Sequence, residues 1–237
     1  MNHFKLKWDN KFALISVLLF GMWAQVLQAI EVRFITVEKG LNELYYLNAE
    51  GNYTETNLPP YEVSEPFDVG LSEGKVRIFR QTLIEDRLVY ETIAEADPSS
   101  LRKALGVIHN QAQVWRLGLF DDSAKAFPRG TFRIINLLPV AIATRIGTTP
   151  IKTKPYAADI VSVVPPGPRP VVGIVAAYQK EGNWVPFFDK AVGVLPNARV
   201  TGIATVTRHG MDLAYGVDLE DLSREPRVDY FLLNDRP

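Results

Sequence analysis

The sequence contains no cysteine, which excludes disulfide bonds, thiolate metal sites and thiol catalysis together. Histidine is scarce as well. His3, His109 and His209 are the only three, and none stands in a His-x-His or His-Glu-x-x-His spacing. There is no Gly-x-Ser-x-Gly elbow and no glycine-rich phosphate loop. We therefore expect no metal ion, no cofactor and no catalytic residue, and we assign no binding residue.

The sequence also has no excess of either positive or negative charge. The net charge is -1, and lysine and arginine do not cluster in any one stretch. Because phosphate backbones are bound by basic surfaces, we expect no nucleic acid partner. The 47% hydrophobic and 22% charged content is that of a globular protein, long enough for one large domain or two modest ones.

The N-terminus has the pattern of a secretory signal peptide. Lys5, Lys7 and Lys11 precede an apolar run from Phe12 to Leu27, and a small residue follows at Ala29. The alternative is a retained anchor, but a bilayer-spanning helix needs roughly 20 apolar residues and this run is shorter. We expect residues 1–29 to be removed, leaving no stable membrane span.

The signal-peptide pattern and the absence of cysteine together predict where the protein is located. Small secreted domains of eukaryotes usually carry disulfides, so an exported chain without cysteine fits a bacterial envelope better. No cysteine is present for lipid attachment. We expect the protein in the periplasm or cell envelope, or outside the cell.

The rest of the chain is a succession of short apolar segments separated by turn formers, which predicts an all-β fold. Seven strands are expected in the first half: Val32–Val37, Leu44–Asn48, Pro66–Val69, Lys75–Gln81, Leu88–Ile93, Leu105–His109 and Val114–Phe120. Seven more are expected in the second: Thr131–Leu137, Ala141–Ile146, Ile160–Val164, Val171–Tyr178, Trp184–Phe188, Arg199–Thr207 and Asp212–Asp218.

The two series repeat one another. Val32-Arg-Phe-Ile-Thr-Val37 and Phe132-Arg-Ile-Ile-Asn-Leu137 share the order apolar, Arg, apolar, Ile, small polar, apolar. Further matches at similar spacing join Pro60-Tyr61 to Pro155-Tyr156, Pro98 to Pro196, and Trp115–Asp122 to Ala214–Asp221. Because the matched segments keep a similar spacing from the first strand to the last, we predict two copies of one domain.

We therefore expect two tandem immunoglobulin-like β-sandwich domains, 30–124 and 125–222, the second an internal repeat of the first. A C-terminal tail, 223–237, would follow. It either adds an edge strand to its own sheet or pairs with another chain. The run Pro165–Pro170 is expected to be a rigid connecting loop, with a polyproline ligand as the alternative.

The second copy also carries a family resemblance. Phe127-Pro-Arg-Gly-Thr-Phe-Arg-Ile-Ile-Asn-Leu-Leu-Pro139, followed by Ala143-Thr-Arg-Ile-Gly147, resembles exported bacterial β-sandwich proteins of unknown function. Those proteins pair a Pro-x-Gly turn with a strand ending in Asn-Leu, then a second strand and a Gly turn. The resemblance implies an exported sandwich and no particular activity.

Individual polar and aromatic residues are expected to be structural. The pairs Glu85-Asp86, Asp121-Asp122 and Glu220-Asp221 are expected to be solvated turn residues, because neighbours on a strand point to opposite faces. His109 and His209 are expected in turns, and Arg133 on a solvated face. Trp115 and Trp184 are expected in the core or between the domains.

Two functions are compatible with the sequence. The first is a non-enzymatic envelope protein, a binding or assembly module whose partner is another envelope protein or a polysaccharide. The alternative is a secreted hydrolase of an envelope or extracellular polymer, which would need two facing carboxylates in an interdomain cleft. A pilus chaperone is a weaker analogue. Leu44-Tyr-Tyr-Leu-Asn48 is similar to a chaperone strand motif, but it lies too early in the domain.

Overall fold

A computed structural model describes residues 28–37, 41, 43–111, 114–162, 170–195, 197–207 and 227–235. Several expectations fall outside these residues: the signal peptide up to residue 27, the Pro165–Pro170 loop except its last residue, His209, Asp212–Asp218 and Glu220-Asp221. No helix in the described residues is long and apolar enough to cross a membrane.

The described chain is all-β, as expected, with sixteen strands in four four-stranded sheets. The first eight strands are β1 (Ala29–Thr36), β2 (Leu44–Leu47), β3 (Tyr53–Thr56), β4 (Phe67–Gly70), β5 (Val76–Ile84), β6 (Arg87–Ala96), β7 (Lys103–Gln111) and β8 (Val114–Asp121). The second eight are β9 (Thr131–Asn136), β10 (Ile142–Ile146), β11 (Thr149–Thr153), β12 (Ala157–Ser162), β13 (Val171–Lys180), β14 (Asn183–Gly193), β15 (Arg199–Thr207) and β16 (Arg227–Asp235).

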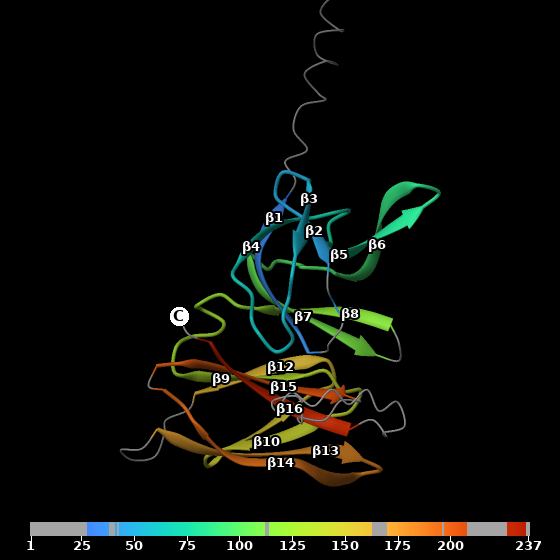
Figure 1. Cartoon of the computed structure of the whole chain (residues 1–237). Helices are drawn as coiled ribbons and strands as arrows, with labels where there is room; N and C mark the ends of the chain where they lie inside the picture. The colour runs from blue at the N-terminus through green and yellow to red at the C-terminus, as the bar shows by residue number, and fades with distance from the viewer. Residues whose placement is uncertain are drawn as a thin grey trace, which may run out of the picture.

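The two sets of eight strands share one topology (Figure 1). In the first half, the inner sheet has the order β4-β1-β7-β8 and the outer sheet the order β3-β2-β5-β6. In the second half, the inner sheet is β12-β9-β15-β16 and the outer sheet is β11-β10-β13-β14. Within each inner sheet the first strand runs parallel to the seventh, β1 beside β7 and β9 beside β15. Every strand of one half therefore has a counterpart in the other.

Each half is a β-sandwich around its own core. Alternate residues of β1, such as Val32 and Phe34, enter the core of the first half with Leu44 and Ile78 from the outer sheet. The core of the second half is built in the same way, with Phe132 and Ile134 of β9 facing Ile174 of β13. The sandwich prediction is thus confirmed.

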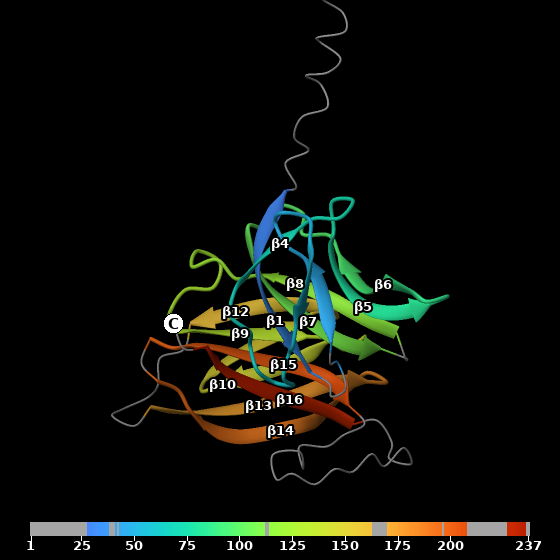
Figure 2. The ribbon, with the colours of Figure 1, turned by 45° about the horizontal axis from the view of Figure 1, so that its top comes forward.

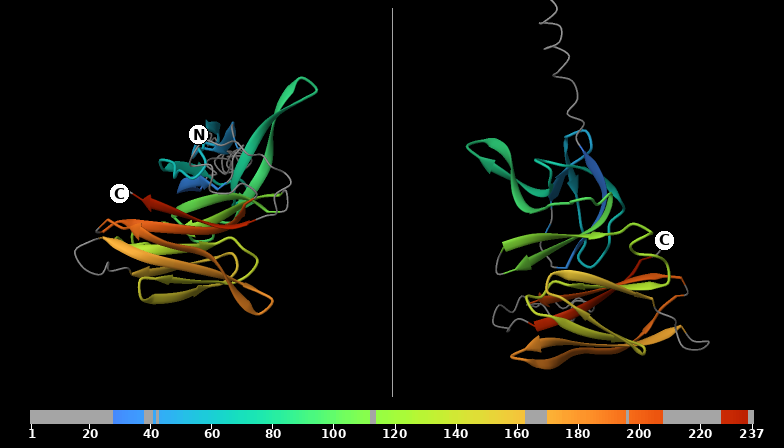
Figure 3. Two further views of the ribbon diagram at one scale, coloured as in Figure 1. Left: turned by 60° about the horizontal axis from the view of Figure 1, so that its bottom comes forward. Right: turned by 180° about the vertical axis from the view of Figure 1, so that it is seen from behind.

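A third apolar cluster lies between the halves, where the two inner sheets face each other. Ile35 and Leu105 from the first half pack with Ile135, Ile203 and Leu233 from the second. The molecule is consequently a stack of four sheets, outer, inner, inner, outer, which Figures 2 and 3 show from other directions. The inner sheets are covered on both faces at their centre, so all six residues of β9 are buried.

The backbone repeats in detail as well. Tyr61 and Tyr156, each after a proline-containing turn, have positive φ angles of 64° and 53°. Ser99 and Asn197, which follow Pro98 and Pro196 of the matched sequence, have φ angles of 52° and 62°. Such left-handed residues are uncommon outside glycine, so their recurrence at matched positions supports the sequence alignment there.

Some expected elements differ from the structure. β3 and β11 were missed because Tyr53–Thr56 and Thr149–Thr153 have little apolar character. β16, the counterpart of β8, lies in the expected tail and not at Ala214–Asp221. It pairs with β15 over its whole length, which agrees with the tail adding a strand to its own sheet.

In immunoglobulin constant domains the first and second strands share a sheet. Here they belong to different sheets, so an immunoglobulin-like topology is not confirmed. The domain boundaries stay predictions.

Candidate functional site

Two arginines from equivalent strands converge on one aspartate between the halves. Arg33 of β1 donates to Asp122 Oδ2 from Nε at 2.9 Å and from Nη2 at 2.6 Å. Arg133 of β9 places Nη1 3.1 Å from the other oxygen, Oδ1. Asp122 follows β8, in the segment that joins the halves. A single buried carboxylate therefore holds an arginine from each sandwich.

Arg133 is almost fully enclosed, with 1% of its surface exposed. Its Nε and Nη2 donate to Thr201 Oγ1 at 3.2 Å, and Nη1 donates to the carbonyl of Asp121 at 3.2 Å. Burial lowers its pKa to about 10, with Asp122 acting in the opposite direction, so it is charged at neutral pH. The expectations of a solvated Arg133 and a solvated Asp122 are wrong. Arg133 lies on a face of the second inner sheet that is covered, and Asp122, which follows β8, is buried in its contact with the arginines.

A third guanidinium joins this group around an aromatic ring. Arg199 of β15 lies 5.0 Å from the centre of the Phe127 ring, and Arg133 lies 4.1 Å from it. Arg199 also donates to the carbonyls of Asp122 at 3.4 Å and Phe127 at 3.5 Å. Rings attract cations through their quadrupole. Phe127 therefore helps to hold two positive groups close together beside one carboxylate.

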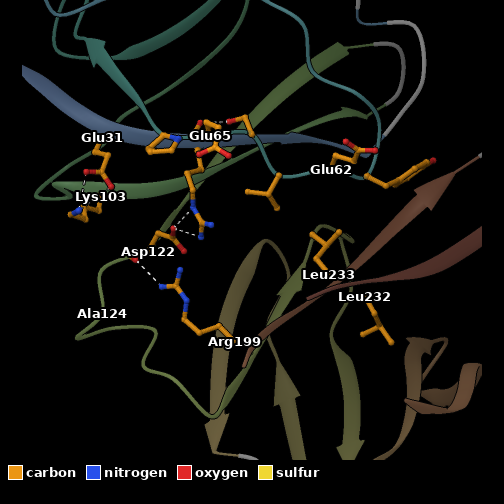
Figure 4. Close-up of a pocket in the computed structure, with 14 residues that line it drawn as sticks. Glu31, Glu62, Glu65, Lys103, Asp122, Ala124, Arg199, Leu232 and Leu233 are labelled. Atoms are coloured by element: carbon orange, nitrogen blue, oxygen red, sulfur yellow. Dashed lines mark hydrogen bonds and ion pairs between the residues drawn. The ribbon is translucent and has the colours of Figure 1, made fainter. Parts of the chain in front are cut away.

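An open cleft of about 1150 Å³ lies beside this cluster (Figure 4). Arg33, Asp122 and Arg199 line it on one side, and the loop 61–66 and Leu232 complete the wall. A cleft between the halves is thus present, but the hydrolase hypothesis requires in addition that two carboxylates face each other across it.

Of the four carboxylates that line it, however, Glu31 and Asp122 are engaged in ion pairs. Glu31 forms an ion pair with Lys103 at 2.8 Å, and Asp122 is bound by the arginines. Glu62 and Glu65 belong to the same loop, and Figure 4 shows Glu31, Glu62 and Asp122 at separate places along the cleft. Glycoside hydrolysis needs a free carboxylate and a second one across the bond to be cut. The cleft instead offers a mixed-charge wall suited to holding polar groups.

His109 lies inside β7, so its expected place in the strand Leu105–His109 is confirmed, whereas its expected place in a turn is wrong. Its side chain is 5% exposed and lines a cavity of about 230 Å³ together with Arg116, Leu137 and Tyr156. Burial, and secondly the charge of Arg116, lowers its pKa to about 4. Among the described residues, no group of three His, Asp or Glu side chains is placed to hold a metal ion.

Three further expectations have mixed outcomes. Glu85 and Asp86 are exposed and form the turn between β5 and β6, as expected. Trp115 packs against the core of the first half, also as expected. Trp184 is 42% exposed and lies beside Lys152, with 5.5 Å between the ammonium and the ring centre. The interior position expected for Trp184 is wrong.

A second surface was not foreseen from the sequence: the free face of the first outer sheet. Tyr53 stacks on Tyr90 with 3.8 Å between ring centres, while Tyr45 meets Tyr90 and Phe79 meets Tyr53 edge-on. The amide of Gln81 accepts from Tyr45 Oη at 3.3 Å and donates to Tyr90 Oη at 3.1 Å. The alternation of residues along the strands places these rings on one face of the sheet, but the sequence does not show which face stays uncovered.

This aromatic cluster continues into the β5–β6 hairpin. Leu83 comes two residues after Gln81 and Leu88 two residues before Tyr90, so both leucines lie on the same face as the rings. They are 65% and 63% exposed. We call the six residues Tyr45, Tyr53, Phe79, Leu83, Leu88 and Tyr90 the aromatic-apolar surface.

No protein-family model matches the chain, and no curated protein matches it in sequence.

Proposed function

We propose that this protein is an exported, non-enzymatic envelope protein that acts as a binding or assembly module through the aromatic-apolar surface. The observation that carries the proposal is the continuity of this surface: four rings, of which Phe79 is itself buried, and two leucines on one face of one sheet. Interface centres are enriched in aromatic side chains and poor in charge. Tyrosine, in particular, gives a large contact area at little conformational cost.

The exposure of the hairpin supports this role. Large apolar side chains scattered singly on a surface need no explanation, whereas contiguous ones mark interaction sites. Leu83, Leu88 and Tyr53 are all more than 40% exposed, and the register places the two leucines directly opposite each other. The Gln81 amide between the tyrosines adds polar groups that fix the ring orientations.

The interdomain cleft is the observation that favours the alternative, a secreted hydrolase. Its size suits a polymer segment, but its carboxylates argue against the chemistry. Asp122 forms ion pairs with two arginines, and Glu31 is paired with Lys103. The cleft therefore ranks second.

The deciding experiment is capture from envelope extract on the immobilised chain, with proteins and polysaccharides analysed separately. We expect a protein partner that is retained by the wild type and lost from the double variant Tyr53→Ser/Leu88→Ser. Trp184→Ala, which removes an exposed ring from the other outer sheet, is the matched control and should retain it. Recovery of polysaccharide and no protein would overturn the assembly role.

A further inference from the structure

The outer half of β6 is an uncovered sheet edge. In the described chain, β6 ends the order β3-β2-β5-β6, and the turn end of the β5–β6 hairpin projects away from the rest of the molecule (Figures 1 and 3). Near its C-terminal end, Ile93 and Ala96 pack against the same core as Trp115 of β8. Toward the turn, residues 87–89 and Glu91 are exposed.

This edge is only partly protected. Exposed edge strands are commonly guarded by charged side chains, especially lysine, by proline or by a bulge at the edge. The segment Arg87-Leu-Val-Tyr-Glu91 contains no lysine or proline, its two charges are of opposite sign, and the bulge of this hairpin lies opposite Ile78/Phe79, closer to the body. Leu88 and Val89 are instead 63% and 38% exposed. Such an edge is suited to pairing with another strand.

The sequence of the edge is complementary to itself. When two identical antiparallel strands are related by a two-fold axis, the axis must pass between one residue and the same residue of the second copy. The reason is that two residues directly opposite each other must either both direct their backbone groups toward the partner strand or both direct them away from it. Centring on Val89 places Arg87 opposite Glu91 of the second copy, twice by symmetry, and Leu88 opposite Tyr90.

Neighbouring registers lose this match. Centring on Leu88 places Glu85 opposite Glu91 of the second copy, and like charges directly opposite are destabilising. Centring on Tyr90 places Arg87 opposite the apolar Ile93. Within each hairpin Arg80 already lies opposite Glu91, so the Val89 register extends the row to Arg80, Glu91 and the second Arg87.

We propose that two copies of this chain associate through β6, in antiparallel register centred on Val89, to form one continuous eight-stranded sheet. The edge of the free chain then disappears, and the aromatic-apolar surfaces of both copies lie on the same face. The inference goes beyond the proposed function because association needs no other envelope component. A monomeric chain that still captures an envelope partner would overturn the dimer and leave the proposed function standing.

A disulfide trap tests the register directly, since the chain has no cysteine of its own. Residues directly opposite across an antiparallel pair have Cβ atoms roughly 4.5–5.5 Å apart, close enough for a bridge with little adjustment. The purified Val89→Cys variant should form a disulfide-linked dimer under mild oxidation. Leu83→Cys, at a more exposed position on β5, is the control and should stay mainly unlinked. Equal cross-linking of both variants, or of neither, would overturn the proposed register.

Charge variants test the same geometry by sedimentation equilibrium of the uncross-linked chain. Val89→Lys places two ammonium groups at the axis and should leave only monomer, whereas Leu83→Lys should remain dimeric. Arg87→Glu should weaken association about tenfold, since both ion pairs become like-charge pairs. Arg87→Glu/Glu91→Arg should recover it. Thermal unfolding identifies any variant that fails to fold. This check matters most for Glu91→Arg, because the new arginine faces Arg80 within the same hairpin. A wild-type monomer, or a dimer unaffected by Val89→Lys, contradicts the proposal.

Discussion

Arg33 and Asp122 lie 89 residues apart in the chain, and their side chains meet with 2.6 Å between Nη2 and Oδ2. Arg133, at the equivalent place in the second copy of the motif, binds the other oxygen of the same carboxylate. The repeated arginine is thus used twice at one point, where the two inner sheets come together. Among the described residues no second carboxylate is shown in this contact, so the two equivalent strands form an asymmetric junction there.

Asp122→Asn tests how far this junction depends on the negative charge. The change removes the negative charge that Arg33 and Arg133 share, and removing one partner of a buried pair costs about 3 kcal/mol or more. We expect the free energy of unfolding, measured in urea, to fall by this amount. Asp121→Asn, the exposed neighbour, is the control and should change it by less than about 0.5 kcal/mol. Equal effects at both positions would mean that the pairing contributes little.

Arg133→Lys tests whether shape matters in addition to charge. The planar guanidinium reaches Thr201, the Asp121 carbonyl and Asp122 at once and lies over the Phe127 ring. An ammonium is a compact point charge that cannot make all of these contacts. We expect a loss of about 2 kcal/mol of unfolding free energy, as for two buried hydrogen bonds. Arg129→Lys on the exposed turn nearby should be neutral, and a neutral Arg133→Lys would show that only the charge is needed.

Much of the fold could be predicted because it depends on local patterns. Lys75–Arg80 alternates polar and apolar residues, and its strand β5 indeed buries Val76 and Ile78 on one face. The repeated motif located β1 and β9 within a few residues. β3 and β11 could not be found, since their pairing with β2 and β10 rather than any apolar pattern makes them strands.

The candidate site could not be predicted because it depends on what covers each sheet. In β9 the alternation correctly places Arg133 opposite Phe132 and Ile134, but the sequence does not state that a second sandwich packs on the arginine side. The same limit explains His109, which is buried where the halves meet. Trp184 and the aromatic-apolar surface show the converse, because the outer sheets leave rings uncovered.

His109 gives the protein a predictable sensitivity to acid. Burial lowers its folded-state pKa to about 4, while in the unfolded chain the pKa is about 6.5. Between these values the unfolded state binds the proton and the folded state does not, so stability is full above pH 6.5 and is lost as the pH falls toward 4. The shift corresponds to roughly 3 kcal/mol.

The measurement compares wild type with His109→Gln in urea titrations at pH 7 and pH 4. Acidic groups contribute to both proteins, so the difference between the two pH dependences isolates the histidine. We expect wild type to lose about 3 kcal/mol more than the variant over this interval. Identical pH dependences would show that His109 is protonated in the folded state at ordinary cost.

Gly106 and Gly202 occupy equivalent positions in β7 and β15, and each makes room for a buried aromatic ring. A Cβ atom at Gly106 would lie 2.7 Å from Cδ1 of Phe34, and one at Gly202 would overlap the phenol group of Tyr230. Both rings are almost fully buried and have little space to move. We expect Gly106→Ala and Gly202→Ala each to lower the free energy of unfolding by about 1–3 kcal/mol, through overpacking. Gly173→Ala in β13 is the matched control. A Cβ there meets nothing within 4 Å, so the change should be neutral or slightly stabilising. If all three variants lowered the free energy of unfolding equally, the replacement of any strand glycine, and not the overlap with a buried ring, would explain the result.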